Sequence, residues 1–309
     1  MTNHAIYIII PLYNSKLTIS FAVESALRQE GICRYVIIVD HGSNDGSLDY
    51  VKEQYGSNKD IHILSLTRSP DERRSASRPL NAGFRYGLEL CKKKPMLSNW
   101  MIRLDADDVL YANDSISSAL LHYSEGIKLI NGRIIMLNES QKLGYQYSSK
   151  YQRASIRELV RGSVYSMAHH ATLIASELVE LILSQDAYCY PEDISYGEDL
   201  DFSIRLLTQC KEQQLRMIGQ NILIKKLDGR TITNSIGTKC IIQDHMKIFK
   251  RHTTLSRLFL LNILLWFGLD ACGRIGKAVN KKRRPPAFKY AEILPFPYVD
   301  AIETFERLK

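Results

Sequence analysis

The sequence predicts an α/β fold in which a mixed, mainly parallel sheet is flanked by helices. Over the first 110 residues, short apolar runs alternate with segments in which apolar residues recur at helical spacing. This alternation is typical of a parallel, doubly wound sheet. The composition, with 45% hydrophobic and 24% charged residues, is that of a globular chain. The six cysteines form no C-x-x-C pair, which argues against a zinc module and favours a reducing compartment.

Apolar runs, helical spacing and a proline predict the first two strand–helix units. The apolar run Ile6–Pro11 follows no basic region and is stopped by proline, so we expect a buried strand there and not a signal peptide. Ser15–Gln29 has apolar residues at helical spacing. Tyr35–Val39 is a second apolar run, and Ser47–Tyr55 is expected to form the helix behind it.

The later elements follow the same alternation up to residue 110 and become less regular beyond residue 130. Apolar runs predict the strands Ile61–Leu66, Trp100–Leu104, Arg133–Leu137, Ala171–Ala175 and Ile222–Lys226. Helical spacing predicts the helices Arg78–Lys93 and Leu200–Gln209. Ligands bind such sheets beyond the carboxyl ends of the strands. The candidate binding segments are therefore Pro11–Asn14, Asp40–Asp45 and Asp105–Asp108.

Charge is distributed unevenly along the chain. The net charge of +8 divides into −3 for residues 1–210 and +11 for residues 211–309. Near the basic run Lys281–Arg284, the apolar segment Leu258–Leu269 is shorter than the roughly 18 residues that a membrane span requires. We therefore expect two parts, a main domain and a basic, mostly helical extension. Their bounds are residues 1–235 and residues 236–309.

The sequence leaves several interpretations of this extension open. An apolar helix beside basic residues favours docking on an anionic membrane surface. The same helix could instead pack on the main domain or form a homodimer seam, and the basic run could be a solvated loop. No nucleic-acid partner is expected, because the chain has no recognition motif and its N-terminal part is net acidic.

Three carboxylates lie directly after the predicted strand that ends at Leu104. Asp105, Asp107 and Asp108 fall within four positions, where their charges repel one another unless a cation or strong donors neutralise them. Oxygen ligands suit Mg²⁺ or Mn²⁺, which commonly bridge to the phosphates of a substrate. The pattern predicts a metal site, with a solvated acidic turn as the alternative.

Two further polar segments carry candidate functional carboxylates. Val39–Ser47 sets small residues between Asp40 and Asp45. Asp40 can accept from a base or ribose, or the segment can form an Asx-type turn before a helix that Asp45 caps. The segment lacks the G-x-G-x-x-G pattern of dinucleotide-binding folds. Glu198 and Asp199 open a predicted helix, where carboxylates are electrostatically favoured and where one could act as a general base toward a hydroxyl.

In their order and spacing, these motifs resemble an inverting family 2 glycosyltransferase with a GT-A fold. The segments that carry the resemblance are Ile9–Asn14, Val39–Ser47, Leu104–Asp108 and Gly197–Asp199, with Arg78–Gly83 and His169–Leu173 between them. The resemblance covers roughly residues 5–235. It implies a GT-A-type, Rossmann-like mixed sheet for the main domain.

The resemblance implies inverting transfer of a sugar, as in hexosyl- or N-acetylhexosaminyltransferases, from a nucleotide-diphosphate sugar such as a UDP-sugar. The acceptor would be a hydroxyl of a glycan or lipid-linked saccharide, assisted by Mn²⁺ or Mg²⁺. Asp199 would be the general base, and Glu198 would orient the acceptor. Asp107 would be the main metal ligand, aided by Asp105 or Asp108. The residues implied at the nucleotide are Pro11, Tyr13, Asn14, Asp40, Arg78 (or Arg74), Asn81 and Asp105.

Two positions depart from the family pattern. His41 stands where many relatives have a second Asp next to the base. Because an imidazole can donate as well as accept, the identity of the nucleotide base is left open. Asp228 stands where relatives often have a His. It is either a metal or phosphate-side ligand or a turn residue.

Family habit implies polysaccharide synthesis in bacteria, by a protein that is cytoplasmic or peripheral on the inner face of the membrane. Two other classes stay open. A nucleotidyltransferase has a similar sheet and metal, but usually a Gly-rich basic loop where this chain has Leu12–Lys16. An inactive glycosyltransferase-like or polyanion-binding scaffold is the non-enzymatic alternative, against which the retained Asp105, Asp107 and Asp199 argue.

Overall fold

The described part of the chain alternates strands and helices, as the sequence predicts. The computed structural model describes residues 4–69, 71–73, 75–94, 96–138, 143–149, 167–226, 238–252 and 291–296. Its strands are β1 (His4–Leu12), β2 (Cys33–His41), β3 (Ile61–Leu66), β4 (Ser98–Arg103), β5 (Val109–Leu110), β6 (Leu129–Asn138), β7 (Leu143–Ser149), β8 (Thr172–Ala175), β9 (Leu215–Lys226) and β10 (Ala291–Phe296). Its helices are α1 (Ile19–Leu27), α2 (Ser47–Tyr55), α3 (Ser77–Lys93), α4 (Ser115–Leu120), α6 (Ser176–Asp186), α7 (Glu198–Gln209) and α9 (Thr238–Arg251).

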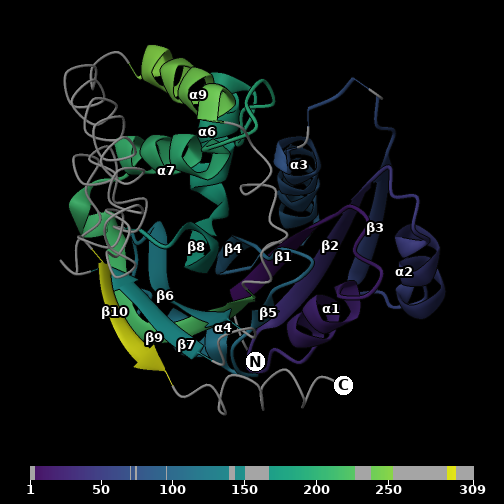
Figure 1. Ribbon diagram of the computed structural model, residues 1–309. Helices are drawn as coiled ribbons and strands as arrows, with labels where there is room; N and C mark the ends of the chain where they lie inside the picture. The colour runs from purple at the N-terminus through teal and green to yellow at the C-terminus, as the bar shows by residue number, and fades with distance from the viewer. Residues whose placement is uncertain are drawn as a thin grey trace.

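One sheet contains all of these strands. Its main path runs β10-β7-β6-β8-β4-β1-β2-β3, and β9 pairs with β6 and β5 beside it (Figure 1). Strand β1 is parallel to both β2 and β4, and β3 is parallel to β2. Strand β8 joins β4 in the antiparallel sense, whereas β9 runs parallel to β6. This confirms the predicted α/β fold with a mixed, mainly parallel sheet.

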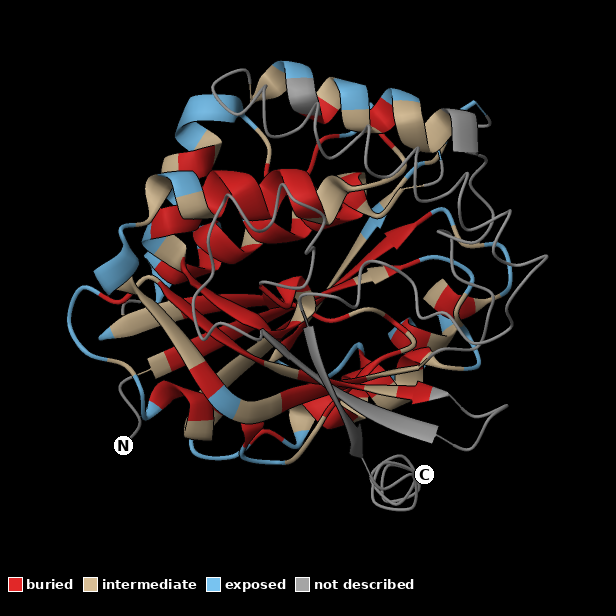
Figure 2. Cartoon of the chain, turned by 60° about the vertical axis from the view of Figure 1, so that its left-hand side comes forward, coloured by how far each residue is buried: buried red, intermediate tan, exposed pale blue. Residues whose placement is uncertain are grey.

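Strand β1 is buried on both faces, which explains its unbroken apolar sequence. Ile6, Ile8 and Ile10 belong to the core shared with α1, α2 and α4. Tyr7 and Ile9 belong to the core shared with α3, α6 and α7. Figure 1 shows these two groups of helices on opposite sides of the sheet, and Figure 2 shows the central strands as buried. Strands covered on both faces have continuous apolar runs instead of alternating ones.

Gly83 allows α3 to lie close to the sheet. A Cβ atom on Gly83 would lie 2.5 Å from Cγ2 of Ile9 and 3.2 Å from Cγ2 of Val39. Helix propensity favours Ala over Gly by about 1 kcal/mol, but overpacking costs about 1–3 kcal/mol. We expect Gly83→Ala to lower the free energy of unfolding, measured by urea denaturation, by about 1–2 kcal/mol.

Gly87 in the same helix is the matched control. A Cβ atom there would first meet the flexible end of Met101, at 3.2 Å from Cε. Gly87→Ala should therefore be neutral or stabilising. Equal stability of the Gly83→Ala and Gly87→Ala variants would contradict the close approach at Gly83.

The predicted bounds of the helices and strands are most accurate where turn-forming residues flank the element. The predictions for α2 and β3 are confirmed at both ends. Helix α1 begins only at Ile19, because the backbone turns at Ser15, whose carbonyl accepts from the N–H groups of Thr18 and Ile19. Strand β9 begins at Leu215, earlier than predicted. Its first half was not predicted because polar residues interrupt the apolar pattern there. Among the described strands and α-helices, those that the sequence did not predict are β5, β7, β10, α4 and α6.

The C-terminal extension is only partly described. Its described residues form helix α9 and strand β10, which pairs antiparallel with β7 at the edge of the sheet. Leu258–Leu269 and Lys281–Arg284 lie outside the described residues, so membrane docking and a homodimer seam stay predictions. Among the helices of the described ranges, none combines the length and the apolar character needed to cross a bilayer.

Candidate active site

A cluster of three carboxylates lies at the carboxyl end of β4. Asp105, Asp107 and Asp108 each offer one carboxylate oxygen, and these oxygens lie within 4.8 Å of one another. Burial, strengthened by the neighbouring Asp105 and Asp107, raises the pKa of Asp108 to about 7. Such an oxygen-only set fits Mg²⁺ or Mn²⁺. The structure therefore brings together the three predicted carboxylates, and their roles as ligands stay predictions.

Lys225 contributes a positive charge to this cluster. Its Nζ atom lies 3.1 Å from Oδ2 of Asp105 and 3.0 Å from Oδ2 of Asp108. The register of β5 with β9 brings it there, because Val109, next to Asp108, pairs with Ile224. These two carboxylates raise the pKa of Lys225 above its ordinary range despite its burial. The cluster is thus partly neutralised by the chain itself.

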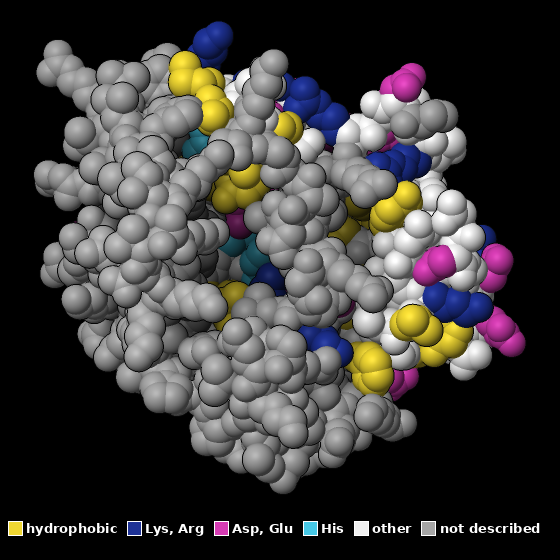
Figure 3. All heavy atoms as spheres, in the orientation of Figure 1, with side chains coloured by type: hydrophobic (Ala, Val, Ile, Leu, Met, Phe, Trp, Pro, Cys, Tyr) yellow, Lys and Arg dark blue, Asp and Glu magenta, His cyan; other side chains and the backbone are white. Residues whose placement is uncertain are grey.

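Arg103 connects the acidic cluster to a second group of carboxylates. Its Nε atom lies 2.6 Å from Oδ1 of Asp105, and its Nη1 atom lies 3.7 Å from Oε1 of Glu198. Burial alone would raise the pKa of Asp105, but Arg103, Lys225 and His170 hold it well below its ordinary value. Figure 3 shows acidic, histidine and basic side chains together inside a hollow on one face of the molecule.

The second group of carboxylates opens helix α7. Gly197, with a φ of 82°, turns the backbone into the helix, and Glu198 and Asp199 are its first two residues. One Asp199 oxygen, Oδ1, accepts from the N–H of Leu200 at 2.8 Å. Burial and, next, the charge of Asp199 raise the pKa of Glu198 to about 7, against the attraction of Arg103. The predicted base and its neighbour therefore share one helix end, beside Arg103.

The raised pKa of Glu198 predicts a pH-dependent stability. The folded state holds the Glu198 proton up to about pH 7, whereas the unfolded state loses it near the ordinary glutamate pKa of 4.5. Between these values the folded state binds more protons, so this group lowers stability as pH rises, by up to about 1.4 kcal/mol per pH unit. We expect the stability of Glu198→Gln, relative to wild type, to increase from pH 5 to pH 7 in urea unfolding. A pH-independent difference between the two proteins would contradict this pKa.

The two histidines before β8 have different surroundings. His169 is buried, with Nδ1 at 2.9 Å from the Ser203 hydroxyl and Nε2 at 2.7 Å from the Tyr190 hydroxyl. Burial lowers its pKa to about 3, so it is a neutral structural residue at neutral pH. His170 instead faces the acidic cluster, with Nε2 at 3.2 Å from Oδ2 of Asp105. His169 therefore has a structural role, and His170 lies at the acidic cluster.

Tyr13 and Asn14 lie on the loop that follows β1. The Tyr13 ring is 40% exposed, and the Arg68 guanidinium lies over it at 4.4 Å from the ring centroid. Asn14 has a left-handed φ of 49°. Its N–H donates to the Ser43 hydroxyl at 3.0 Å, and its side-chain oxygen accepts from the N–H of Asn44 at 2.8 Å. The loops after β1 and β2 thus form one surface, on which Tyr13 is partly exposed and Arg68 lies over its ring.

Asp40 lies at the carboxyl end of β2, beside the end of β1, where Pro11 pairs with Val39. Its side chain is 1% exposed. Oδ2 accepts from the N–H groups of Gly42 and Ser43 at 3.1 and 3.3 Å, so the expected Asx-type turn is present. Oδ1 is buried and has no hydrogen-bond partner among the residues that the structure describes. Because a buried acceptor without a partner costs free energy, Oδ1 is suited to accept from a ligand.

His41 has a carboxylate partner that the sequence did not indicate. Its Nε2 atom lies 2.9 Å from Oε1 of Glu72, and the other Glu72 oxygen lies 2.9 Å from Nη1 of Arg78. Burial lowers the pKa of His41, although Glu72 opposes the shift. A carboxylate therefore still lies next to position 41, where many relatives have an Asp. Arg78 also donates to the carbonyl of Thr67 at 3.1 Å.

Asn81 holds the segment that precedes α7. Its Nδ2 atom donates to the Tyr190 carbonyl and to Glu192 Oε1 at 2.8 and 2.9 Å. Its Oδ1 atom accepts from the N–H groups of Cys189 and Tyr190 at 2.9 and 2.8 Å. The amide is thus used at both ends for structure, and its contact with a nucleotide stays a prediction.

Some site residues were missed, and some predicted ones cannot be placed. Asp228 and Arg74 lie outside the described residues. Arg103, Lys225 and Glu72 were not predicted from the sequence as site residues. Arg103 lies two positions before Asp105, on a strand otherwise apolar near its end, which is a signal for a paired charge. Nothing in the sequence near Lys225 or Glu72 indicates their partners, because both contacts depend on long-range register.

Comparison with known proteins gives a family match and several similar solved structures. The model of the family described as glycosyl transferase family 2 matches residues 7–180. A search of curated proteins found no match. Among solved structures, S. aureus TarS 1-349 in complex with UDP-GlcNAc is 15% identical, with a TM-score of 0.62 over 98% of this chain and 81% of that chain. TarS 1-349 in complex with UDP is 17% identical, with a TM-score of 0.54 over 84% and 65%.

Two further TarS structures bear on length. The chain covers 60% of TarS 1-349 crystallised without a named ligand, at a TM-score of 0.52 and 17% identity, and 72% of this chain is aligned. It covers 36% of the longer TarS chain. At these identities the likeness establishes the fold alone, and it agrees with the predicted GT-A architecture.

Proposed function

Because the chain belongs to glycosyltransferase family 2, we propose that it transfers a sugar, with inversion, from a UDP-sugar to a hydroxyl of a glycan or lipid-linked saccharide. The observation that carries the proposal is the continuous charged path from the acidic cluster through Arg103 to Glu198 and Asp199. It supports one cleft with a diphosphate side and an acceptor side. Two of the similar structures are complexes of TarS with UDP and UDP-GlcNAc, which supports the choice of donor.

The donor side of the site would bind the nucleotide. Tyr13 would stack on the base, and the buried Oδ1 of Asp40 would accept from it. Asp107, with Asp105 and Asp108, would hold Mg²⁺ or Mn²⁺. When bound, such an ion offsets the negative charge that develops on the leaving diphosphate. The Lys225 ammonium, between two of these carboxylates, would add to the positive potential at the same place.

The acceptor side would supply the base. The Asp199 carboxylate takes the proton of the acceptor hydroxyl as its oxygen forms a bond to the anomeric carbon. The bond from that carbon to the diphosphate oxygen breaks on the opposite face, so the anomeric centre inverts and no covalent enzyme intermediate is needed. Glu198, held beside Arg103, would orient the acceptor.

A thermal-shift screen with nucleotides and nucleotide sugars tests this function. We expect UDP and one or more UDP-sugars to raise the melting temperature, and Mn²⁺ or Mg²⁺ to increase the shift. A ligand at 100 times its Kd stabilises a protein by about 2.7 kcal/mol, which such a screen detects. Analysis of the product with the selected donor then identifies the linkage and its anomeric configuration. If no nucleotide or nucleotide sugar binds, with or without metal, the proposed function is wrong.

A further inference from the structure

Helix α9 contacts the backbone that leads into the candidate base. Asp244, in the middle of α9, is 0% exposed. Its Oδ2 atom accepts from the N–H groups of Ser195 and Tyr196, at 2.8 and 3.2 Å. Gly197 follows directly, and then come Glu198 and Asp199. Hydrogen bonds to an ionised acceptor are roughly twice as strong as neutral ones, so this carboxylate fixes the backbone next to the base.

The second oxygen of Asp244 contacts the segment before α3. Oδ1 lies 3.3 Å from Nη1 of Arg73. Arg73 is the neighbour of Glu72, whose carboxylate contacts His41 and Arg78. One buried carboxylate therefore contacts both the segment before α3 and the segment before α7. Because a buried charge needs a partner of opposite sign, the Arg73 guanidinium offsets the free-energy cost of burying the Asp244 carboxylate.

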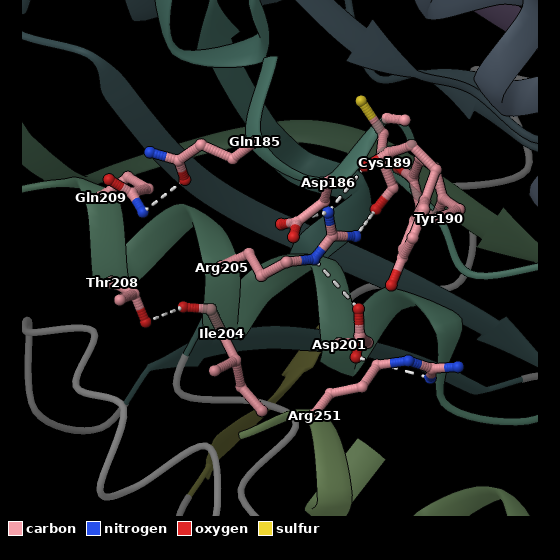
Figure 4. Close-up of polar contacts among 12 residues, drawn as sticks. Gln185, Asp186, Cys189, Tyr190, Asp201, Ile204, Arg205, Thr208, Gln209 and Arg251 are labelled. Atoms are coloured by element: carbon pink, nitrogen blue, oxygen red, sulfur yellow. Dashed lines mark hydrogen bonds and ion pairs between the residues drawn. The ribbon is translucent and has the colours of Figure 1, made fainter. Parts of the chain in front are cut away.

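Other residues of α9 pack against the start of α7. A Cβ atom on Gly197 would lie 3.0 Å from Cδ1 of Ile248, so the two elements touch where the backbone has its left-handed turn. Farther along, Arg251 lies 3.8 Å from Oδ1 of the buried Asp201, in the first turn of α7. Figure 4 shows Arg251 and Arg205 approaching Asp201 from different elements. These contacts leave the first turn of α7 little freedom to shift.

We propose that Asp244 is a positioning residue for the acceptor side of the site, acting through its two hydrogen bonds to the backbone of Ser195 and Tyr196. The inference rests on the proposed function, because it takes Glu198 and Asp199 to be the acceptor-side carboxylates. Helix α9 lies beyond residues 7–180, which match the family model. The positioning role of Asp244 makes helix α9, which is part of the C-terminal region, a component of the active site.

The test compares Asp244→Ala and Asp244→Asn with wild type in the full chain. We expect Asp244→Ala to lower kcat for UDP release from UDP-GlcNAc, or from the nucleotide sugar that the screen selects. The expected loss is about 10²-fold, the cost of a misplacement of about 1 Å, with the Kd for UDP unchanged. Amide exchange of Ser195 and Tyr196, followed by mass spectrometry, should become faster. Asp244→Asn keeps an oxygen that accepts from both N–H groups, so it should recover much of kcat and of the amide protection.

Two control variants isolate the hydrogen bonds to the backbone. Lys250 is an exposed residue on the same helix, so Lys250→Ala should leave kcat and exchange near wild type. Arg73 is half-exposed. Arg73→Ala should affect kcat less than Asp244→Ala does, because the bonds to Ser195 and Tyr196 remain.

Several outcomes would overturn the inference. A wild-type kcat or wild-type amide exchange in Asp244→Ala would contradict the positioning role. Equal losses of kcat and UDP affinity would also contradict it, because they indicate a general structural role. If Asp244→Ala does not fold, Asp244→Asn decides: its weaker, uncharged acceptor must speed amide exchange at residues 195 and 196 and lower kcat while UDP affinity is retained. If wild type binds no nucleotide, the proposed function fails. Unchanged exchange in the Asp244 variants refutes the positioning role whether or not nucleotide binds.

Discussion

Asp199→Asn is expected to lower turnover by roughly 10²–10⁴-fold, the usual contribution of a positioned general base, while UDP binding stays near wild type. The asparagine amide retains the size of the side chain and an oxygen that can accept from the N–H of Leu200, as Asp199 does. It cannot take a proton from the acceptor hydroxyl. Steady-state kinetics with the selected donor, together with calorimetric titration of UDP, measures the two effects separately.

Glu198→Gln is the matched control for this substitution. Glu198 precedes Asp199 on the same helix end and contacts Arg103, so its amide should alter acceptor affinity more than kcat. Full activity of Asp199→Asn would show that another group is the base. A larger loss of kcat in Glu198→Gln than in Asp199→Asn would assign that role to Glu198.

Asp107→Asn is expected to remove most of the metal-dependent part of donor binding. The substitution deletes one charged oxygen ligand from a cluster of three. Loss of an outer-shell partner already costs about 10–100-fold in metal affinity, and loss of a direct ligand should cost at least as much. Titration of UDP with and without Mn²⁺ measures the effect. We expect affinity in the absence of metal to be retained.

Asp49→Asn serves as the charge control for Asp107. Asp49 lies exposed in the first turn of α2, and its loss changes the net charge of the protein by the same amount. Its metal-dependent UDP binding should equal that of wild type. If Asp107→Asn behaves like Asp49→Asn, Asp107 is not a metal ligand.

Much of the fold was predictable because local residue patterns decide it. The isoleucine-rich run before Pro11 indicates a strand buried on both faces, and the structure gives it helices on both sides. The acidic motif after β4 could be found for a similar reason, since three carboxylates in sequence are close in space wherever the chain goes. Strand β7 and helix α4 were missed because short elements with few apolar residues give weak periodicity.

Contacts between distant segments could not be predicted in this way. Lys225 meets Asp108 only through the register of β5 with β9. Glu72 meets His41 across the ends of neighbouring strands. Asp244 looks like any acidic residue on an amphipathic helix until α9 is seen against the segment before α7. Each of these residues is ordinary in the sequence, and each acquires its role from partners more than 30 positions away.

Arg103 has a consequence for how mutations in this site combine. Its guanidinium contacts Asp105 on one side and Glu198 on the other, so both carboxylates draw on the same positive charge. Neutralising Asp105 leaves Arg103 to interact more strongly with Glu198, and the reverse also holds. Residues that share a partner typically show interaction energies of about 0.5–3 kcal/mol. Single substitutions on the two sides of the site are therefore not independent perturbations, and only a double-mutant cycle through Arg103 separates their contributions.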